Sequence, residues 1–342
     1  MAWYNTTGPL ADTVISSRVR LARNIKGYPF PSRLDTNSAN EIIEKISAPL
    51  ENAGFRRINF SDISPIMATS YVERHYVSPE FAIMETPHTL LLQENGGVAV
   101  MICEEDHLRI QSILSGLSLE EAYQNASAIE KRLDKDFDFA YNDNLGYLTH
   151  CPSNLGTGMR ASVMMFLPAL TKGGYIASLA AQLAKLGLAM RGLFGEGSGS
   201  VGCMYQISNQ ISLGVSEGEI LSKLNEAVRQ VSDSELQARK NIVEDALENL
   251  TDRVGRSLGI LKHAHMISTE EFIRLFCEVR LGIYKGLVSD ITYDQLGTLL
   301  VEAMPATLTL SSESTPKGEA ARDKLRAARI KAVLDATENR KG

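Results

Sequence analysis

Short apolar runs and polar turns alternate along the first two thirds of the chain. Residues Thr89–Gln93 and 98–103 are apolar, and Glu94-Asn95-Gly96-Gly97 joins them. Asn-Gly between two such runs is a strong hairpin signal. Apolar and polar residues also alternate over 204–213, which predicts another strand. Hairpins together with separate helices predict an α+β fold with a largely antiparallel sheet flanked by helices.

Two further patterns fill the middle of the chain. Residues 147–151 read as a strand that ends before Pro152. Residues 171–174 form a Thr-Lys-Gly-Gly turn, and the Ala- and Leu-rich stretch 175–191 predicts a helix after it. The region up to about residue 235 therefore mixes strands and helices.

From about residue 235 onward the pattern is helical throughout. Residues 235–265 keep helical periodicity over one long span, and Ser268 starts a capping box that predicts the next helix. Asp290 or Thr292 is expected to start another helix, and Thr315-Pro316 precedes a helix over 319–336. Residues 311–318 are the expected flexible connection. We predict two domains, 1–238 and 239–342, of which the second is all helical.

Composition excludes several classes of protein. The length of 342 residues suits two domains, and the net charge of −6 provides no general basic field for nucleic acid. No apolar stretch is long enough for a membrane span, and the N-terminus lacks the features of a signal peptide. The four scattered cysteines are typical of reduced thiols. We expect a cytoplasmic protein with no direct nucleic-acid or membrane partner.

Four polar segments are candidates for chemistry: Ser16-Ser17-Arg18-Val19-Arg20 and residues 103–109, 151–160 and 191–199. If the first is extended, Arg18 and Arg20 share one face of a strand. Each segment also has an ordinary structural interpretation. The arginines fit a solvated strand edge, the acids of 104–106 fit a solvated turn, and the glycines can simply shape turns.

Together the segments favour phosphoryl transfer from a nucleotide. This reaction needs concentrated positive charge and in-line positioning, and arginine forks match phosphate oxygens well. The sequence contains no G-x-x-x-x-G-K-[ST] loop. Gly197-x-Gly199-x-x-Gly202 matches a dinucleotide-binding fingerprint, but a strand-like pattern follows it where that fold requires a helix.

These segments resemble the phosphagen (guanidino) kinase superfamily, and most closely its bacterial branch of protein-arginine kinases. Cys-Pro-Ser-Asn-Leu-Gly-Thr-Gly at 151–158 is the most specific match, and the resemblance runs from about residue 14 to 214. It implies a glutamine-synthetase-like catalytic domain, with ATP and with Mg²⁺ held mainly by phosphates and water. The implied ATP-binding residues are Ser16, Ser17, Arg18, Val19, Arg20, His75, Arg109, Arg160, Ala161, Ser162, Val163, Met164, Arg191, Gly192, Leu193, Phe194, Gly195 and Glu196.

The resemblance also implies catalytic roles. Glu105 and Glu196 would hold the substrate guanidinium, whose high pKa makes it a poor nucleophile, and would accept its proton. Cys151 would tune the reacting nitrogen as a thiolate favoured by nearby positive charge. Glu104 and Asp106 would support the site. His75 matches the family's adenine-side histidine, although a surface histidine is the plain alternative.

One departure from the family pattern concerns the acidic segment. The family usually has asparagine before Glu-Glu-Asp, whereas Cys103 stands there in this chain. A thiol does not form the hydrogen bonds of an amide, so the loop geometry is in question.

The resemblance favours a polypeptide substrate. Small-molecule members carry a helical domain before the Ser-Ser-Arg segment, but only fifteen residues precede Ser16 here. The helical part follows the catalytic part instead, as in the protein-arginine kinases. It contains Arg322-Asp323-x-x-Arg326-Ala327, which in that family forms a regulatory phosphoarginine-binding pocket. A solvated charged helix is the alternative interpretation of this motif.

The family also implies homodimerisation, a Clp-type protease system, a heat-shock repressor and an activator protein. Two alternative functions stay open. The chain can be a kinase for free arginine or another small guanidine, or a non-catalytic regulator that binds phosphoarginine.

Overall fold

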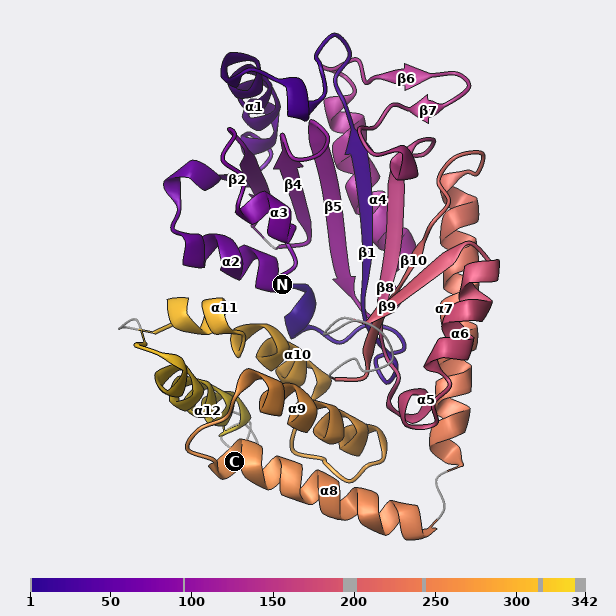
Figure 1. Cartoon of the computed structure of the whole chain (residues 1–342), viewed down its shortest axis with the longest axis vertical. Coiled ribbons are helices and arrows are strands. Elements are labelled where there is room, and N and C mark those ends of the chain that lie inside the picture. The colour runs from indigo at the N-terminus through magenta and orange to yellow at the C-terminus, as the bar shows by residue number, and fades with distance from the viewer. Residues whose placement is uncertain (1, 95, 193–201, 242–243, 313–315, 336–342) are drawn as a thin grey trace.

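A computed structural model describes residues 2–94, 96–192, 202–241, 244–312 and 316–335. Within these residues, eight strands form one sheet in the order β2-β3-β4-β5-β1-β8-β10-β9, and all neighbouring pairs are antiparallel (Figure 1). β6 and β7 form a separate small hairpin. The α+β fold with a largely antiparallel sheet, predicted from the sequence, is confirmed.

The strands are β1 Val14–Arg23, β2 Phe55–Asn59, β3 Thr89–Gln93, β4 Val98–Ile102, β5 Leu108–Ser115, β6 Tyr141–Asn142, β7 Gly146–Tyr147, β8 Met159–Phe166, β9 Leu188–Gly192 and β10 Met204–Asn209. The α-helices are α1 Thr36–Glu51, α2 Pro65–Glu73, α3 Pro79–Ala82, α4 Leu119–Leu133, α5 Pro168–Lys172, α6 Ile176–Lys185, α7 Glu217–Lys240, α8 Glu244–His263, α9 Thr269–Tyr284, α10 Tyr293–Glu302, α11 Pro305–Leu310 and α12 Glu319–Asp335. A short 3₁₀ helix, Trp3–Asn5, precedes β1.

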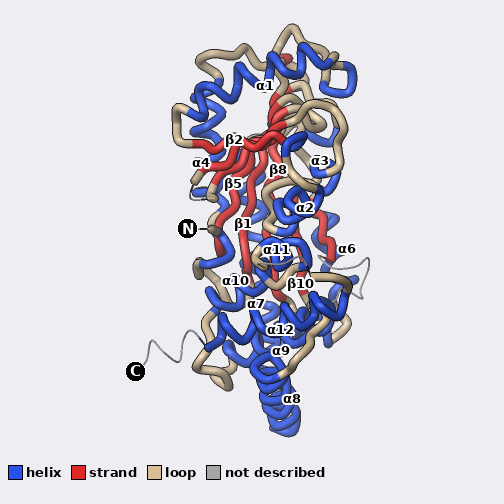
Figure 2. Tube along the Cα trace, turned by 90° about the vertical axis from the view of Figure 1, so that its left-hand side faces the viewer, coloured by secondary structure: helices blue, strands red, loops and turns tan. Residues whose placement is uncertain are grey.

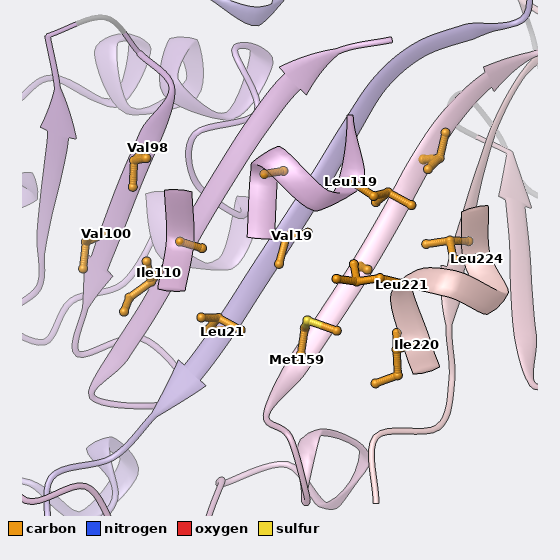
Figure 3. Packing of buried hydrophobic residues seen from close by; sticks show 14 of the residues in the cluster. Val19, Leu21, Val98, Val100, Ile110, Leu119, Met159, Ile220, Leu221 and Leu224 are labelled. Atoms are coloured by element: carbon orange, nitrogen blue, oxygen red, sulfur yellow. The ribbon is translucent and has the colours of Figure 1, made fainter. Parts of the chain in front are cut away.

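One face of the sheet packs on α1, α4 and α7 to form the main core. Figure 3 shows Val19 and Leu21 of β1 and Met159 of β8 beside Leu119 of α4 and Leu221 of α7. Because side chains alternate along a strand, the residues between these apolar ones point to the opposite face. The core on one face therefore fixes which residues of β1 and β8 face the other way.

The opposite face is covered in part by α2 and α3. A smaller cluster, which includes Phe81 of α3 and Leu90 and Met101 of the sheet, lies over β2, β3 and β4. In the edge-on view of Figure 2, α4 and α3 lie on opposite sides of the sheet. The part of this face formed by β5, β1, β8 and β10 carries most of the candidate site.

The helices from α8 to α12 surround a further core beside one end of the sheet (Figure 1). Phe272 and Phe276 of α9 lie in this core, together with Trp3 from the N-terminal segment and Phe166 from β8. Among the helices in the described ranges, none combines the length and the hydropathy that a membrane span requires.

Helix starts predicted from capping residues are confirmed. The Ser268 hydroxyl accepts a hydrogen bond from the Glu271 backbone N–H at 3.1 Å, and α9 begins at the next residue. Thr292, one of two predicted starts, caps α10 through a complete capping box. The β3–β4 hairpin and the strand from Met204 also form as expected, although β10 ends at Asn209. Thr315 lies outside the described residues.

Three elements differ from the prediction. The helix expected over 175–191 ends at Lys185, because Gly187 (φ +73°) turns the chain into strand β9. The strand expected over 147–151 stops at Tyr147, and beyond it the His150 N–H bonds to the Asp106 carboxylate at 2.7 Å. The single helix expected over 235–265 is two helices, since α7 ends at Lys240 and α8 begins at Glu244.

Candidate functional site

Arginines from four strands meet on one face of the sheet. Arg20 of β1 is the register partner of Arg160 of β8, and Arg18 lies two residues away on the same face. The registers of the neighbouring strands place Arg109 of β5 and Arg191 of β9 on that face too. The structure thus brings together all five arginines that the sequence singled out, which we call the arginine cluster.

Burial and mutual repulsion act on this cluster. Burial, with the nearby charges of Arg109 and Arg160, lowers the pKa of Arg18 to about 10. The same causes, with Arg18 added, hold the pKa of Arg20 well below its usual value. Neither Arg18 nor Arg20 forms a side-chain hydrogen bond or ion pair with any described residue. Because a guanidinium group keeps its proton at neutral pH in proteins, the two arginines leave positive charge available to an anion.

The acidic loop between β4 and β5 lies beside this cluster. Glu104 is buried and pairs with Arg109 at 2.8 Å, and it also accepts a hydrogen bond from the Ser78 hydroxyl at 2.5 Å. Glu105 pairs with Arg109 at 3.0 Å, and its side chain is 34% exposed. Glu104 is thus held inside the protein, whereas Glu105 presents a carboxylate that a ligand can reach.

Asp106 joins the acidic loop to the loop that carries Cys151. Its fully buried carboxylate accepts hydrogen bonds from the Asn24 amide and from the His150 backbone N–H, each at 2.7 Å. Cys151 follows directly, with its sulfur 3.0 Å from the Ser153 hydroxyl oxygen. Asp106 therefore fixes the distance between two candidate catalytic segments.

Cys151 also lies within electrostatic reach of the arginine cluster. Burial and the charges of Arg191 and Arg109 lower the pKa of Arg160, whereas the electrostatic interaction with Cys151 raises the pKa of Arg160. The thiolate form of Cys151 stays a prediction.

The backbone explains why the residue before the two glutamates matters. Cys103 is buried with φ +59°, in the left-handed region that asparagine adopts more readily than cysteine. A side chain other than glycine or asparagine costs about 1 kcal/mol there. Burial also raises the pKa of the Cys103 thiol to about 12, so the thiol stays neutral. The loop keeps its hairpin geometry, because the Cys103 N–H bonds to the His107 carbonyl at 2.9 Å.

His75 lies at the end of the cluster nearest Arg18. Burial and the charge of Arg18 lower its pKa to about 4. The Trp3 ring packs edge-on against it at 5.4 Å, and Gln111 donates a hydrogen bond to its carbonyl at 2.7 Å. A small pocket here is lined by Ser16, Arg18, His75, Ile113, Ser162, Met164 and Gln206.

The depressed pKa of His75 predicts a pH effect on stability. An unfolded histidine titrates near pH 6.5, so the stabilisation is complete above that value and is lost as the pH falls toward 4. Between pH 7 and pH 5 we expect wild type to lose about 2 kcal/mol more than His75→Gln in urea unfolding. Equal losses in the two proteins would show that His75 is not held neutral.

Some residues expected to bind ATP point away from this face. Val19, Ala161 and Val163 have side chains in the main core. The Ser17 hydroxyl donates to the Gly116 carbonyl at 2.8 Å and accepts from the Ser118 N–H at 3.0 Å, on the same side as that core. The sequence motifs alone therefore did not distinguish the side chains that line the site from those that pack in the core beneath it.

Leu193, Phe194, Gly195 and Glu196 lie outside the described residues, so the distance between Glu105 and Glu196 is not described. Gly192 is the last residue of β9.

Three residues near the site were missed by the sequence reasoning. Trp3 and Gln111 hold His75, and Ser208 accepts a hydrogen bond from Arg160 at 3.2 Å. The alternation of β10 already placed Ser208 on a polar face, but only the sheet order brings it to Arg160. Nothing local marks Trp3, which is 72 positions away from His75.

The motif on α12 differs from the expected arrangement. Arg326 is fully buried and donates to the carbonyls of Ala303 at 2.9 Å and Ile267 at 2.7 Å. Asp323 pairs with the same guanidinium at 2.6 Å. Arg322 is half-buried, and Ala327 is buried. Arg326 and Asp323 therefore join α12 to its neighbours, and Arg322 is the more accessible arginine of the motif.

In the described part of the chain, no group of three or more histidine, cysteine or carboxylate side chains is arranged to hold a metal ion.

Comparison with known proteins agrees with this geometry. Residues 38–238 match the family described as ATP:guanido phosphotransferase, C-terminal catalytic domain, and residues 247–342 match the Protein-arginine kinase McsB C-terminal domain. A protein-arginine kinase of Symbiobacterium thermophilum is 42% identical, covering 98% of this chain and 96% of its own length. One from Pelotomaculum thermopropionicum is 40% identical, covering 90% and 88%.

Solved structures of guanidino kinases share the fold. Lombricine kinase superposes with a TM-score of 0.59 at 27% identity, over 71% of each chain. The duplicated taurocyamine kinase of Schistosoma mansoni, with bound transition state analog components, superposes with a TM-score of 0.60 at 26% identity. The match covers 85% of this chain and 48% of that one.

Proposed function

We propose, since this chain belongs to the protein-arginine kinase family of ATP:guanido phosphotransferases, that it transfers the γ-phosphoryl group of ATP to arginine side chains of proteins. The observation that carries this proposal is the arginine cluster, in which Arg18 and Arg20 form no side-chain hydrogen bond or ion pair with a described residue, beside the accessible carboxylate of Glu105.

The arginine cluster would bind the phosphates of ATP. Guanidinium forks pair with phosphate oxygens, and charges converging from several strands can neutralise the charge spread over the transferred group. His75, held neutral between Trp3 and Arg18, would lie beside the base. Mg²⁺ would accompany the nucleotide and be held mainly by phosphates and water, as suits a small, strongly hydrated ion.

Glu105 and Glu196 would present the target arginine. Their carboxylates would orient one guanidinium nitrogen toward the γ-phosphorus and accept the proton that this nitrogen loses. The N–P bond forms as the bond between the γ-phosphorus and the bridging oxygen breaks, and ADP leaves with that oxygen. Cys151, on the neighbouring loop, would position the guanidinium nitrogen and adjust its reactivity. Asp106 would hold the loops of Glu105 and Cys151 at a fixed distance from each other through its two hydrogen bonds.

We propose that the chain divides into a catalytic domain, 1–238, and a helical domain, 239–342, that supports homodimerisation and senses phosphoarginine. Arg322 would make the first contact with the phosphate, because Arg326 is engaged with backbone carbonyls. The enzyme would act in the cytoplasm, mark proteins for a Clp-type protease and control a heat-shock repressor with the help of an activator protein.

The test is direct. An unfolded protein is incubated with the enzyme, ATP and Mg²⁺ and analysed by mass spectrometry under non-acidic conditions, because the N–P bond of phosphoarginine is labile in acid. Phosphate on arginine supports the proposal. Rapid ATP turnover with free arginine and none with protein would point to a small-molecule kinase. ATP binding with no transfer to either would point to a binding regulator.

A further inference from the structure

Exposed apolar side chains gather beside the loop that carries Cys151. Tyr141 is 58% and Leu145 42% exposed on the β6–β7 hairpin. Ile211 is 49% and Leu213 47% exposed just after β10. We call these four side chains the apolar rim. Single exposed apolar residues are common on protein surfaces, but a group of them near a reaction centre suggests a binding surface.

The two halves of the rim are joined by close backbone contacts. A Cβ atom on Gly146 would lie 2.3 Å from the Gly156 carbonyl oxygen, and one on Gly156 would lie 2.6 Å from the Leu213 Cα. The hairpin, the 151–158 loop and the chain after β10 therefore pack directly on one another. Glycine is required at both positions by this approach.

The rim is also tied to the reaction centre. The Ser212 hydroxyl lies 2.9 Å from the Ser153 carbonyl oxygen, two residues beyond Cys151. On the hairpin side, Asn24 donates both to the Leu148 carbonyl at 2.9 Å and to Asp106 at 2.7 Å. Figure 1 shows the β6–β7 hairpin beyond the end of β8 and β10.

The hairpin and the segment that leads into it are acidic. Residues 134–147 contain four aspartates and one lysine. Asp138 pairs with Lys26 at 3.1 Å, whereas the exposed Asp134, Asp136 and Asp143 form no ion pair with a described residue. This surface therefore combines apolar contact area with a negative charge that would attract a cationic partner.

We propose that the apolar rim and these aspartates bind the substrate polypeptide on either side of its target arginine. The occupant is an extended chain segment that carries apolar and cationic side chains. Charge complementarity favours this occupant, and the contacts with the 151–158 loop place it where its arginine can enter the reaction centre. The inference rests on the proposed function and adds a sequence preference to it. Preferred target arginines are those flanked in the substrate sequence by lysine and leucine and not by glutamate.

The experiment compares three 20-residue peptides, each with one central arginine. The flanks are Leu/Lys, Leu/Glu or Gly/Ser. For wild type we expect kcat/KM to be about tenfold higher with the Leu/Lys peptide than with the Leu/Glu peptide. In Asp136→Asn/Asp143→Asn, this ratio should fall to about threefold, because each exposed charge contributes only a modest energy.

The apolar contacts are tested by Tyr141→Ser/Leu145→Ser and by Leu145→Ser alone, a change that leaves Tyr141 and Tyr147 in contact in the hairpin. Both should raise KM for the Leu/Lys peptide, by about tenfold in the double variant, with kcat unchanged. The matched control is Tyr175→Ser/Asp233→Asn. Tyr175 is 59% exposed at the start of α6, and Asp233 is exposed on α7; neither belongs to the apolar rim or to the acidic segment, so the control should behave as wild type.

The outcomes separate the two proposals. If wild type does not discriminate between the Leu/Lys and Leu/Glu peptides, or if the rim variants match the control, the rim does not bind substrate. If wild type phosphorylates no peptide, the proposed function fails. The rim is then tested by fluorescence polarisation of a labelled Leu/Lys peptide without ATP, where equal affinity for wild type and rim variants would overturn it.

Discussion

Replacing Glu105 with glutamine will lower the rate of phosphoryl transfer by about a thousandfold, in the range typical of a lost general base. Glutamine keeps the shape of the side chain but cannot accept a proton or neutralise a guanidinium. ATP affinity should stay within about threefold of wild type, because Arg109 keeps its second partner, Glu104, at 2.8 Å. Single-turnover kinetics and equilibrium ATP binding measure the two effects separately.

Two variants serve as controls for this experiment. Glu94→Gln changes an exposed glutamate on the β3–β4 turn and should have no effect. Arg160→Ala removes a member of the arginine cluster and should weaken ATP binding. If Glu105→Gln loses as much nucleotide affinity as Arg160→Ala, the division between phosphate-binding arginines and guanidinium-binding carboxylates is wrong.

Replacing Arg239 with alanine will destabilise the protein by about 3–5 kcal/mol, because it leaves a buried charge without its partner. Arg239 and Glu235 are fully buried and pair at 2.6 Å. Arg239 also donates to the carbonyls of Asp12 and Phe166, each at 3.1 Å. Its loss leaves these acceptors unsatisfied as well. Urea unfolding measures the change in the free energy of unfolding.

The chain contains a matched pair for comparison. Arg256 and Asp252 are also four residues apart on a helix and pair at 2.7 Å, but their side chains are 75% and 61% exposed. Arg256→Ala should cost far less than Arg239→Ala, because an exposed helix pair is solvated and contributes little to stability. Similar losses for the two variants would mean that burial does not control the strength of these ion pairs.

The ion pair between Arg239 and Glu235 also connects helix α7 to neighbouring elements. The Glu235 carboxylate accepts hydrogen bonds from the first N–H groups of α5, at Ala169 and Leu170. The Lys285 ammonium group, just after α9, donates to the Arg239 carbonyl at 2.7 Å. The ion pair therefore joins α7 to the sheet, to α5 and to the end of α9. Its removal should weaken the packing of α7 against these elements.

Local patterns along the chain were sufficient to predict several helices and strands and one face of the site. The Asn-Gly signal predicted the β3–β4 hairpin, and capping residues predicted where α9 and α10 begin. Strand alternation was enough to put Arg18 and Arg20 on one face. These features depend on residues a few positions apart, whose conformations are set by local sterics and hydrogen bonds.

Which residues meet in the folded protein depends on long-range packing. The register of β1 with β8 brought Arg160 to Arg20, and long-range packing brought Trp3 to His75. Packing also placed Arg326 inside the helical part, although the sequence indicated an arginine on the helix surface, accessible to a phosphate or to solvent. Strand β9 formed from residues that have helical periodicity because β10 offered a ladder of hydrogen bonds. Such outcomes depend on the free energy of packing segments far apart in the chain, which no local pattern contains.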